Sequence, residues 1–474
     1  MSDATTSATD GWLDRGGGSE GAPERWVLTI TWSLDEPERV GEACPLAPDG
    51  VERIFGRGDS TPEETIERIV FGRLRPGGAR DARLVAGKGI SRDQLRVVSR
   101  RGAVHVRRTG RCALRVNGVA AQAAELVHGD VLTLQDQLVL LVTWRPALRR
   151  ASDLDVPDLG EPDADGMVGE SAAMWKLRER VGFVARSDRH VLVLGESGVG
   201  KELVARAVHT RSSRASNELV ARNAATFPPG LIDAELFGNV DGYPNPGMSA
   251  RPGVIGQSHL STLFLDEIGE MASSLQAHLL RVLDGGEYHR LGEARARSAD
   301  IRLVAGTNRD ASELKHDLLG RLPLRVHVPP LRDRLEDVPL LTRHLLRQAA
   351  QATPALARFF SGDTALASAH PRIAPELIER LLRHSYPLNV RELDTILWAA
   401  LGSSERRYVE LTSEVEELLD GEGEPPDERV RREPTEAEIT AALAAHENNR
   451  TRAAAQLGVS RYALYRLLRK HGIS

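Results

Sequence analysis

A glycine-rich run between an apolar segment and a helical pattern is the part of this chain best suited to chemistry. It lies in "HVLVLGESGVGKELVARAVH", residues 190–209. Its glycines let backbone N–H groups approach phosphate oxygens, and a lysine at the helix start reaches the outer phosphates. The run therefore predicts a nucleoside-triphosphate site. Its residues are Gly195, Glu196, Ser197, Gly198, Val199, Gly200, Lys201 and Glu202, the last standing where a Ser or Thr normally holds the metal.

Two adjacent carboxylates end the apolar segment "STLFLDEIGE". Asp266 is placed to hold Mg²⁺ through a water, and Glu267 to polarise the attacking water. An Asp-Glu pair after a strand is by itself more often a helix N-cap, but its position after the phosphate loop favours catalysis. A third segment, "IRLVAGTNR", ends at Asn308, which we expect to sense the γ-phosphate. These residues predict an ATPase with ATP and Mg²⁺ as cofactors.

Three short apolar segments must position these groups. Residues 190–194, 262–265 and 301–306 are apolar nearly throughout, as strands buried on both faces of a parallel sheet are, and helical patterns separate them.

Breaks in composition divide the 474 residues into several domains. The front segment has short alternating runs separated by turn residues, typical of an all-β sandwich, and the tail is helical. The residues predict a β-sandwich, an α/β P-loop ATPase and an all-α helix-turn-helix. The predicted parts are a disordered 1–24, a sandwich 25–145, a linker 146–165, a large α/β segment 166–418, a linker 419–434 and a helical tail 435–474.

Composition excludes several classes of protein. Hydrophobic residues make up 41% of the chain and charged residues 27%, and the formal net charge is -5, which argues against wholesale coating of nucleic acid. The two cysteines, Cys44 and Cys112, have no paired spacing, which suits a reducing compartment. The sequence predicts neither a signal peptide nor a membrane span, so we expect a cytoplasmic protein without a membrane partner.

Several motifs occur together in one order: "GESGVGKE", "ELFG", "TLFLDEIGE", "GTNRD", "LPLRVHVPPLRDRLEDVPLL" and "YPLNVREL". Over residues 166–418 this set resembles the AAA+ domain of sigma-54-dependent transcriptional activators, the NtrC-like bacterial enhancer-binding proteins. The resemblance implies an ATPase that remodels sigma-54 RNA polymerase. It also implies an α/β subdomain 166–345, a helical lid 346–418 and a DNA-binding domain 435–474. In that family a Glu normally follows the lysine, which accounts for Glu202.

The resemblance also implies roles for further residues. Asn223 matches the switch asparagine that holds the catalytic glutamate, and Arg391 matches the second sensor, which contacts phosphate from the lid. The family completes each site with two arginines of a neighbouring subunit, six residues apart, in a hexameric or heptameric ring. The matching positions are Arg321 and Lys315, and a lysine lacks the planar fork of an arginine.

The segment after "ELFG" matches the loop with which the family grips sigma-54, whose pattern is GAFTGA. This chain has Gly242, Tyr243, Pro244, Asn245, Pro246 and Gly247 in that place. The Phe-Thr tip is absent, and prolines fix φ and stiffen the loop. Tyr243 still offers an aromatic contact.

The front segment resembles a forkhead-associated (FHA) domain, a β-sandwich that binds phosphothreonine peptides. The resemblance rests on "IFGRG", "GISRDQLRV", "RVNG" and "LVHGDVLTL". Gln94 replaces the family's structural histidine, and "GRCA" replaces its Ser-x-Asn-Gly run. A sandwich that only docks on the ATPase is the alternative. The predicted phosphopeptide contacts are Arg57, Ser91, Arg92 and Asn117.

The tail, "PTEAEITAALAAHENNRTRAAAQLGVSRYALYRLLRKHGIS", has alanines where two helices would cross, a glycine turn and a basic third helix. It resembles the Fis-type domain that ends this activator family and implies binding to an enhancer-like DNA site as a dimer. The predicted contacts are Arg452, Ser460, Arg461, Tyr462, Tyr465 and Arg466.

Two functions are consistent with these features. The first is an ATP-driven activator of sigma-54 polymerase that receives its signal through the FHA-like domain. The second is an ATP-binding, DNA-bound regulator or scaffold that no longer activates this polymerase, because GYPNPG has replaced GAFTGA. An unfoldase subunit would leave the DNA-binding tail unexplained.

Overall fold

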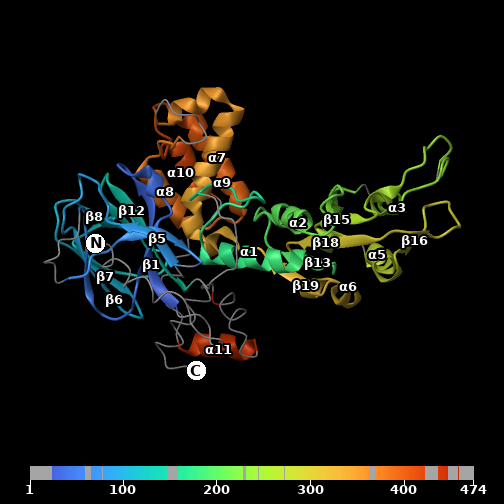
Figure 1. Cartoon of the computed structure of the whole chain (residues 1–474), viewed down its shortest axis with the longest axis horizontal. Coiled ribbons are helices and arrows are strands. Elements are labelled where there is room, and N and C mark those ends of the chain that lie inside the picture. The colour runs from blue at the N-terminus through green and yellow to red at the C-terminus, as the bar shows by residue number, and fades with distance from the viewer. Residues whose placement is uncertain are drawn as a thin grey trace, which may run out of the picture. The chain divides into compact units, whose positions relative to one another are not determined.

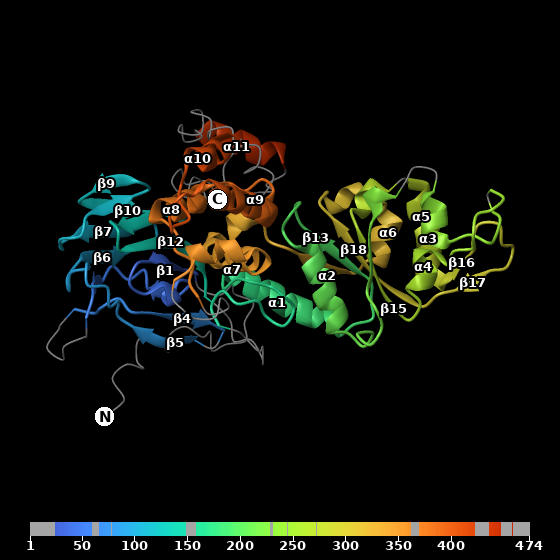
Figure 2. The same ribbon diagram turned by 90° about the horizontal axis from the view of Figure 1, so that it is seen from above.

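The computed structural model of the chain is shown in Figure 1 and, turned by 90°, in Figure 2. It describes residues 24–58, 66–76, 78–147, 158–227, 231–243, 245–271, 273–361, 369–421, 436–446 and 457. The chain divides into two units, 1–412 and 413–474, and each is described by itself.

The front segment forms two antiparallel sheets, with strand orders β5-β4-β2-β1-β12-β11-β8-β9 and β10-β7-β6-β3. Alternate residues of β1, such as Leu28 and Ile30, share one buried core with Val104 and Val106 of β7. The all-β prediction for this segment is confirmed. The strands are β1 (Glu24–Ser33), β2 (Ala43–Leu46), β3 (Glu52–Phe55), β4 (Phe71–Arg75), β5 (Gly78–Arg83), β6 (Leu95–Ser99), β7 (Val104–Arg108), β8 (Leu114–Val116), β9 (Val119–Ala121), β10 (Ala123–Leu126), β11 (Val131–Leu134) and β12 (Leu138–Pro146).

The central segment is built on a five-stranded sheet with the order β14-β15-β18-β13-β19. All its neighbouring strands run parallel, which confirms the predicted α/β architecture. Three of its strands are the segments expected from the sequence. The bounds are β13 (Val191–Leu194), β14 (Val220–Asn223), β15 (Ser261–Asp266), β18 (Ile301–Thr307) and β19 (Leu324–His327).

Helices cover both faces of this sheet (Figure 1), so successive strand residues meet different helices. Val191 and Val193 of β13 share a core with α1 and α2, whereas Leu192 and Leu194 share one with α3 to α6. The strands are therefore apolar throughout, as the sequence indicated. The bounds are α1 (Ala172–Ala185), α2 (Lys201–Thr210), α3 (Ile232–Phe237), α4 (Gly253–Gln257), α5 (Ser273–Gly285) and α6 (His316–Arg321).

Three further helices of the first unit form the lid: α7 (Val338–Ala352), α8 (Pro375–Arg383) and α9 (Asn389–Ser403). The predicted division at residue 345 falls inside α7. In both views α8 lies beside β12 of the sandwich. Trp32 Nε1 of β1 donates to the carbonyl oxygen of Ile373 at 2.8 Å, and the buried side chains of Arg145 and Glu336 form an ion pair. The sandwich therefore packs on the lid.

The second unit contains α10 (Ser413–Gly421) and α11 (Glu436–Ala445). The six residues predicted to contact DNA lie outside the described residues. No described helix is long and apolar enough to cross a membrane.

Candidate nucleotide site and its output loop

The phosphate loop connects β13 to α2, and its glycines have the backbone that the motif requires. Gly198 has a φ of +75° and Gly200 a φ of +104°, in the left-handed region where a side chain is strained. Lys201, the first residue of α2, is only 5% exposed. Its Nζ donates to the carbonyl oxygens of Gly195 at 3.1 Å and Glu196 at 3.3 Å. The buried ammonium is thus held over the loop where phosphates would lie.

The two carboxylates stand at the end of β15 next to this lysine. Glu267 Oε1 lies 3.6 Å from Lys201 Nζ, and Asp266 Oδ1 accepts a hydrogen bond from the Glu267 N–H at 3.0 Å. Glu267 has a φ of +53°, so the chain turns sharply here and directs its carboxylate back toward the loop. Its Oε2 is buried and has no hydrogen-bond partner among the described residues.

Neighbouring strands bring two further predicted residues to this edge. Asn223 ends β14 and is paired in register with Asp266. Its side chain accepts from the Ala225 N–H at 2.9 Å, and among the described residues no hydrogen bond joins it to Glu267. Asn308 directly follows β18 and is exposed. Gly306 of that strand packs so closely on Asp266 that a Cβ would collide with the carboxylate.

The lid contacts the phosphate loop directly at the start of α9. Arg391 Nη1 donates to Ser197 Oγ at 3.3 Å, and the Val390 N–H donates to the carbonyl oxygen of Gly198 at 3.2 Å. The fully buried Asn389 donates from Nδ2 to the carbonyl oxygen of Ser197 at 3.0 Å. The predicted second sensor therefore reaches the loop, together with an asparagine that sequence reasoning missed.

A second missed residue, Arg332, precedes the lid helices. Its guanidinium forms two hydrogen bonds with the Glu196 carboxylate, at 2.5 and 2.8 Å. This bond to Arg332 lowers the pKa of Glu196. Glu196 therefore connects the phosphate loop to the lid through Arg332. Glu202 does not take part in this contact, and it forms an exposed ion pair with Arg206 one turn along α2. Both missed residues stood within motifs visible in the sequence, "PPLRDR" and "YPLNVREL", but their partners are distant in the chain.

The two residues expected to act on a neighbouring subunit flank α6. Lys315 is the N-cap residue and Arg321 ends the helix. Arg321 is half exposed and forms an ion pair with Asp284 of α5, which raises the pKa of the arginine. Neither residue reaches the phosphate loop of its own chain through a described contact.

The predicted sigma-contact loop lies between α3 and α4, beside the hairpin of β16 (Glu287–Tyr288) and β17 (Arg297–Ser298) (Figure 1). Asn239 bridges both, pairing with Arg251 across the loop and with Leu291 of the hairpin. Its fully buried Nδ2 donates to the carbonyl oxygens of Val240, Tyr243 and Ser249. The loop is thus fastened from within at its base.

The tip of this loop is a compact turn. The Gly242 N–H donates to the carbonyl oxygen of Met248 at 2.7 Å, and the Met248 N–H donates to that of Asn245 at 3.1 Å. Gly242 and Gly247 both have positive φ. Tyr243 is 43% exposed and its ring packs against Gly292 of the hairpin. Pro244 lies outside the described residues, whereas Pro246 is exposed.

In the sandwich, Arg57, Ser91 and Arg92 come together. The Arg57 N–H donates to the carbonyl oxygen of Ser91 at 3.1 Å, and Arg68 donates to the carbonyl oxygens of Arg57 and Arg92. Arg57 Nε is buried and has no partner among the described residues. Ser91 Oγ accepts from the Arg111 N–H at 3.0 Å.

The side chain of Gln94 joins the loops that carry Ser91 and Cys112 through hydrogen bonds to their backbone. It is fully buried, and its Oε1 accepts from the N–H groups of Ser91 and Cys112 while its Nε2 donates to the carbonyl oxygen of Cys112 at 2.8 Å. Asn117 lies elsewhere, in the β8–β9 turn, with its side chain bonded to Asp130 and to the Val131 N–H. These contacts give Asn117 a turn-forming role and do not join it to Arg57.

Three successive family models match the chain between residues 167 and 471. Residues 167–328 match the sigma-54 interaction domain, residues 332–429 the AAA+ ATPase lid domain, and residues 434–471 the bacterial regulatory protein Fis family. The chain therefore contains an ATP-binding AAA+ domain with its lid and a Fis-type helix-turn-helix.

Relatives extend this result. The transcriptional regulatory protein GlrR of Escherichia coli K12 is 34% identical over 334 residues, which cover 69% of this chain and 72% of GlrR. The anaerobic nitric oxide reductase transcription regulator NorR of Vibrio vulnificus YJ016 is 40% identical over 256 residues, 52% of this chain and 48% of NorR. A solved structure of NtrX from Brucella abortus with ADP is 30% identical, covers 65% of this chain and 70% of NtrX, and has a TM-score of 0.47.

For three of the curated relatives, the chain spans only between 48% and 60% of their own length. GlrR is covered more fully, and the three matched domains follow in one order over residues 167–471. The chain belongs to the family of sigma-54-dependent transcriptional regulators.

Proposed function

We propose that this protein hydrolyses ATP in a ring of its own copies and uses the energy to act on sigma-54 RNA polymerase at an enhancer-like DNA site. The observation that carries the proposal is the convergence of Lys201, Glu267 and Arg391 on one phosphate loop, from α2, β15 and the lid. Each group is of the type that triphosphate hydrolysis needs.

The roles of the residues follow from their positions. Lys201 and the loop N–H groups bind the β- and γ-phosphates, and Arg391 contacts phosphate from the lid. The carboxylate donors at the edge of the sheet fit Mg²⁺, with Asp266 holding it through a water. When bound, Mg²⁺ neutralises developing charge on the phosphates. Glu267, whose Oε2 has no described partner, accepts a proton from the attacking water.

Completion of the site requires a neighbouring subunit. Arg321 is half exposed on α6, and its described ion pair is with Asp284 and not with its own phosphate loop, which is compatible with action in trans. Insertion into a neighbour's site would have to break its ion pair with Asp284, which exchanges one carboxylate partner for phosphate oxygens. Arg321→Ala should lower ATP turnover, because it removes a charge that stabilises the transition state. If Lys315→Ala has the larger effect, the proposed assignment is wrong.

The two candidate functions differ in whether the predicted sigma-contact loop, residues 242–247, can engage sigma-54. Asn239 and the Gly242–Met248 hydrogen bond give the loop a fixed shape without the Phe-Thr tip. The direct test is open-complex formation by sigma-54 polymerase in vitro with this protein, ATP and enhancer DNA. Intact ATP hydrolysis without stimulation would support the second function, a DNA-bound regulator that does not activate this polymerase.

Restoring GAFTGA at residues 242–247 sharpens this test. We expect the restored loop to bind sigma-54 more tightly in a complex with an ATP transition-state analogue. Arg406→Glu, on an exposed part of the lid, is the control because it lies outside both the loop and the nucleotide site. Strong binding by the unaltered protein would show that GYPNPG is itself a competent contact.

We further propose that the sandwich is an FHA-like domain that binds a phosphothreonine protein. The buried, unpartnered Nε of Arg57 beside Ser91 supports this, because a phosphate would supply the missing acceptor. Full-length protein screened on a phosphothreonine peptide array should bind a subset of peptides, and Arg57→Ala should abolish this binding while leaving ATP turnover unchanged. If phosphorylated and unphosphorylated peptides bind equally, the sandwich is a docking module only.

A further inference from the structure

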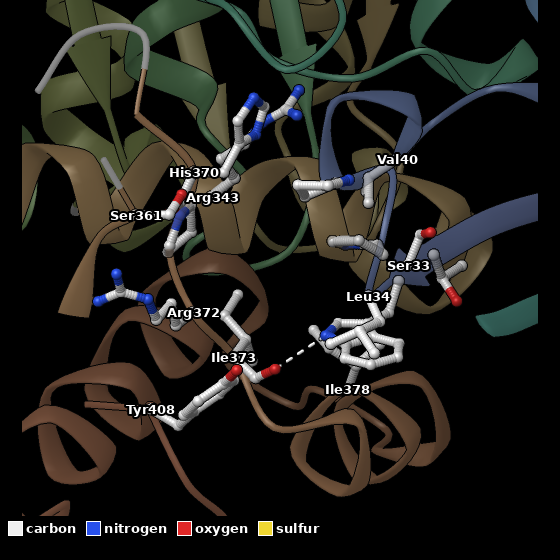
Figure 3. Close-up of a pocket in the computed structure, with 15 residues that line it drawn as sticks. Ser33, Leu34, Val40, Arg343, Ser361, His370, Arg372, Ile373, Ile378 and Tyr408 are labelled. Atoms are coloured by element: carbon white, nitrogen blue, oxygen red, sulfur yellow. Dashed lines mark hydrogen bonds between the residues drawn. The ribbon is translucent and has the colours of Figure 1, made fainter. Parts of the chain in front are cut away.

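We propose that a cavity between the sandwich and the lid binds a small organic anion, an aromatic or branched aliphatic carboxylate. The cavity has a volume of about 180 Å³ and lies between β1, the turn that follows it, and the lid segments around residues 339–343, 370–378 and 408. Figure 3 shows residues of both parts around it. This site is separate from the nucleotide site and from the Arg57 loops.

One side of the cavity is apolar. Leu34, Val40 and Ile378 line it, together with the ring of Trp32. The indole N–H of Trp32 is already bonded to the carbonyl oxygen of Ile373 (Figure 3). The face of this ring is therefore held in place, and it offers a flat surface on which an aromatic or branched group can pack.

The other side carries two buried nitrogen atoms without a hydrogen-bond partner among the described residues. Arg343 is only 5% exposed, and its Nε is buried with no hydrogen-bond partner among the described residues. Nδ1 of the neighbouring His370 is also buried and has no hydrogen-bond partner among the described residues. Arg372 lines the cavity as well. Unsatisfied buried groups of this kind are costly, and a bound acceptor would remove that cost.

The charge at this end favours an anion over a neutral ligand. The described hydrogen bond of Arg343 goes to a carbonyl oxygen, that of Leu159, and not to a carboxylate. The nearby Glu161 is engaged by Arg347. Burial lowers the pKa of Arg343 to about 10, so its guanidinium remains charged at neutral pH. A carboxylate could accept hydrogen bonds from Arg343 while its apolar body contacts Trp32.

The volume limits the size of the ligand. A cavity of roughly 150 Å³ is sufficient for benzene, so about 180 Å³ accommodates a molecule of about the size of benzoate. Because its walls belong to both the sandwich and the lid, an occupant would strengthen the contact between them. The site can therefore be tested by binding alone, independently of ATP turnover and transcription.

The test uses benzoate as the probe and benzyl alcohol as its uncharged match, titrated into the full-length protein by calorimetry and ligand-observed NMR. For a ligand of this size we expect a Kd for benzoate of about 1 mM. Benzyl alcohol should bind at least about 10-fold more weakly, since it lacks the charge-assisted hydrogen bonds. No benzoate binding at about 20 mM, or equal binding of the two probes, would overturn the proposal.

Three variants place the binding in this cavity. Arg343→Gln should weaken benzoate about 10-fold with little effect on benzyl alcohol. Leu34→Trp, at a side chain 45% exposed, should block both probes without disturbing the core, which keeps the test valid if the first variant does not fold. Arg406→Glu, on an exposed part of the lid, is the control. Benzoate binding unaffected by both cavity variants would contradict the assignment.

The chain itself has carboxylates near this cavity, among them Glu38 and Glu161 in the structure and Asp363 in the sequence. Asp363 lies between Ser361 and Ala369, outside the described residues. If benzoate binds only after Asp363→Asn, the chain supplies its own anion and the proposal is wrong. Unchanged binding by this variant supports an external ligand.

Discussion

The two predicted phosphate-binding regions are built in opposite ways. At the nucleotide site, glycines with positive φ arrange backbone N–H groups, and one buried lysine completes the cradle. In the sandwich, the predicted site consists of side chains on separate loops, which Gln94 holds together from below. A backbone site depends on local conformation, whereas a side-chain site depends on loops that are distant in sequence. The first should therefore tolerate changes around it better than the second.

We expect the largest loss of ATP turnover from a substitution of Lys201. Lys201→Ala removes the buried cation that lies beside Glu267 at the phosphate loop, so ATP turnover should fall by at least about 100-fold. Measurement of phosphate release and of nucleotide affinity checks this. The loop backbone should survive, because its glycines set its shape. A variant that keeps a tenth of the activity would mean that the backbone N–H groups alone carry the site.

Loss of Gln94 should have the next largest effect. Gln94→Ala breaks three hydrogen bonds and leaves two partly buried N–H groups and a carbonyl without these partners, which destabilises the loops by about 2–4 kcal/mol. Hydrogen exchange at Cys112 and Ser91 should accelerate while that of α2 stays unchanged. Gln94→His, the residue of the FHA family, should restore protection in part. If hydrogen exchange at Ser91 and Cys112 is unaltered in Gln94→Ala, the sandwich loops do not depend on this side chain, and the proposed difference between the two phosphate-binding regions is wrong.

The third prediction concerns the close approach of the lid. An alanine at Gly198 combines positive φ with a collision against the carbonyl oxygen of Leu388, so Gly198→Ala should separate the lid from the loop. We expect ATP affinity to fall by about 10-fold, for a strain of about 1–3 kcal/mol. Gly402→Ala, in α9 with open space around it, is the matched control and should leave the affinity unchanged.

The smallest expected effect is a pH-dependent difference in melting temperature caused by the Arg332–Glu196 ion pair. The bond to Arg332 lowers the pKa of Glu196, so the stabilisation is present above the ordinary value of 4.5 and is lost as pH falls through the lowered value. Because both side chains are partly exposed, the pair contributes less than about 1 kcal/mol. The melting temperature of Arg332→Leu should be slightly lower than that of the native protein at pH 7, and the gap should close toward pH 3. A constant gap would point to lost packing instead of lost charge.

The sequence predicted the parts of the fold that local patterns determine. Apolar runs identified β13, β15 and β18, and the glycine spacing identified the loop around Lys201. The contacts of Asn389 and Arg332 were missed because they join residues more than 130 positions apart, and only the placement of the lid brings them together. Asn117 was grouped with Arg57 because of a motif, yet its described contacts fasten a hairpin turn. The predicted roles of Asn223 and Lys315 stay predictions, since they concern nucleotide states and a second subunit.

The ion pair of Arg145 and Glu336 also bears on how such a protein can be rebuilt by domain exchange. The sensor domain of a regulator is often treated as a module that can be transferred from one protein to another. Here a graft that omits a cation in place of Arg145 would leave the Glu336 carboxylate buried and uncompensated, at a cost of about 3–5 kcal/mol. A transplanted sensor must therefore carry its own arginine to the lid, and this single position restricts which front domains the ATPase can accept.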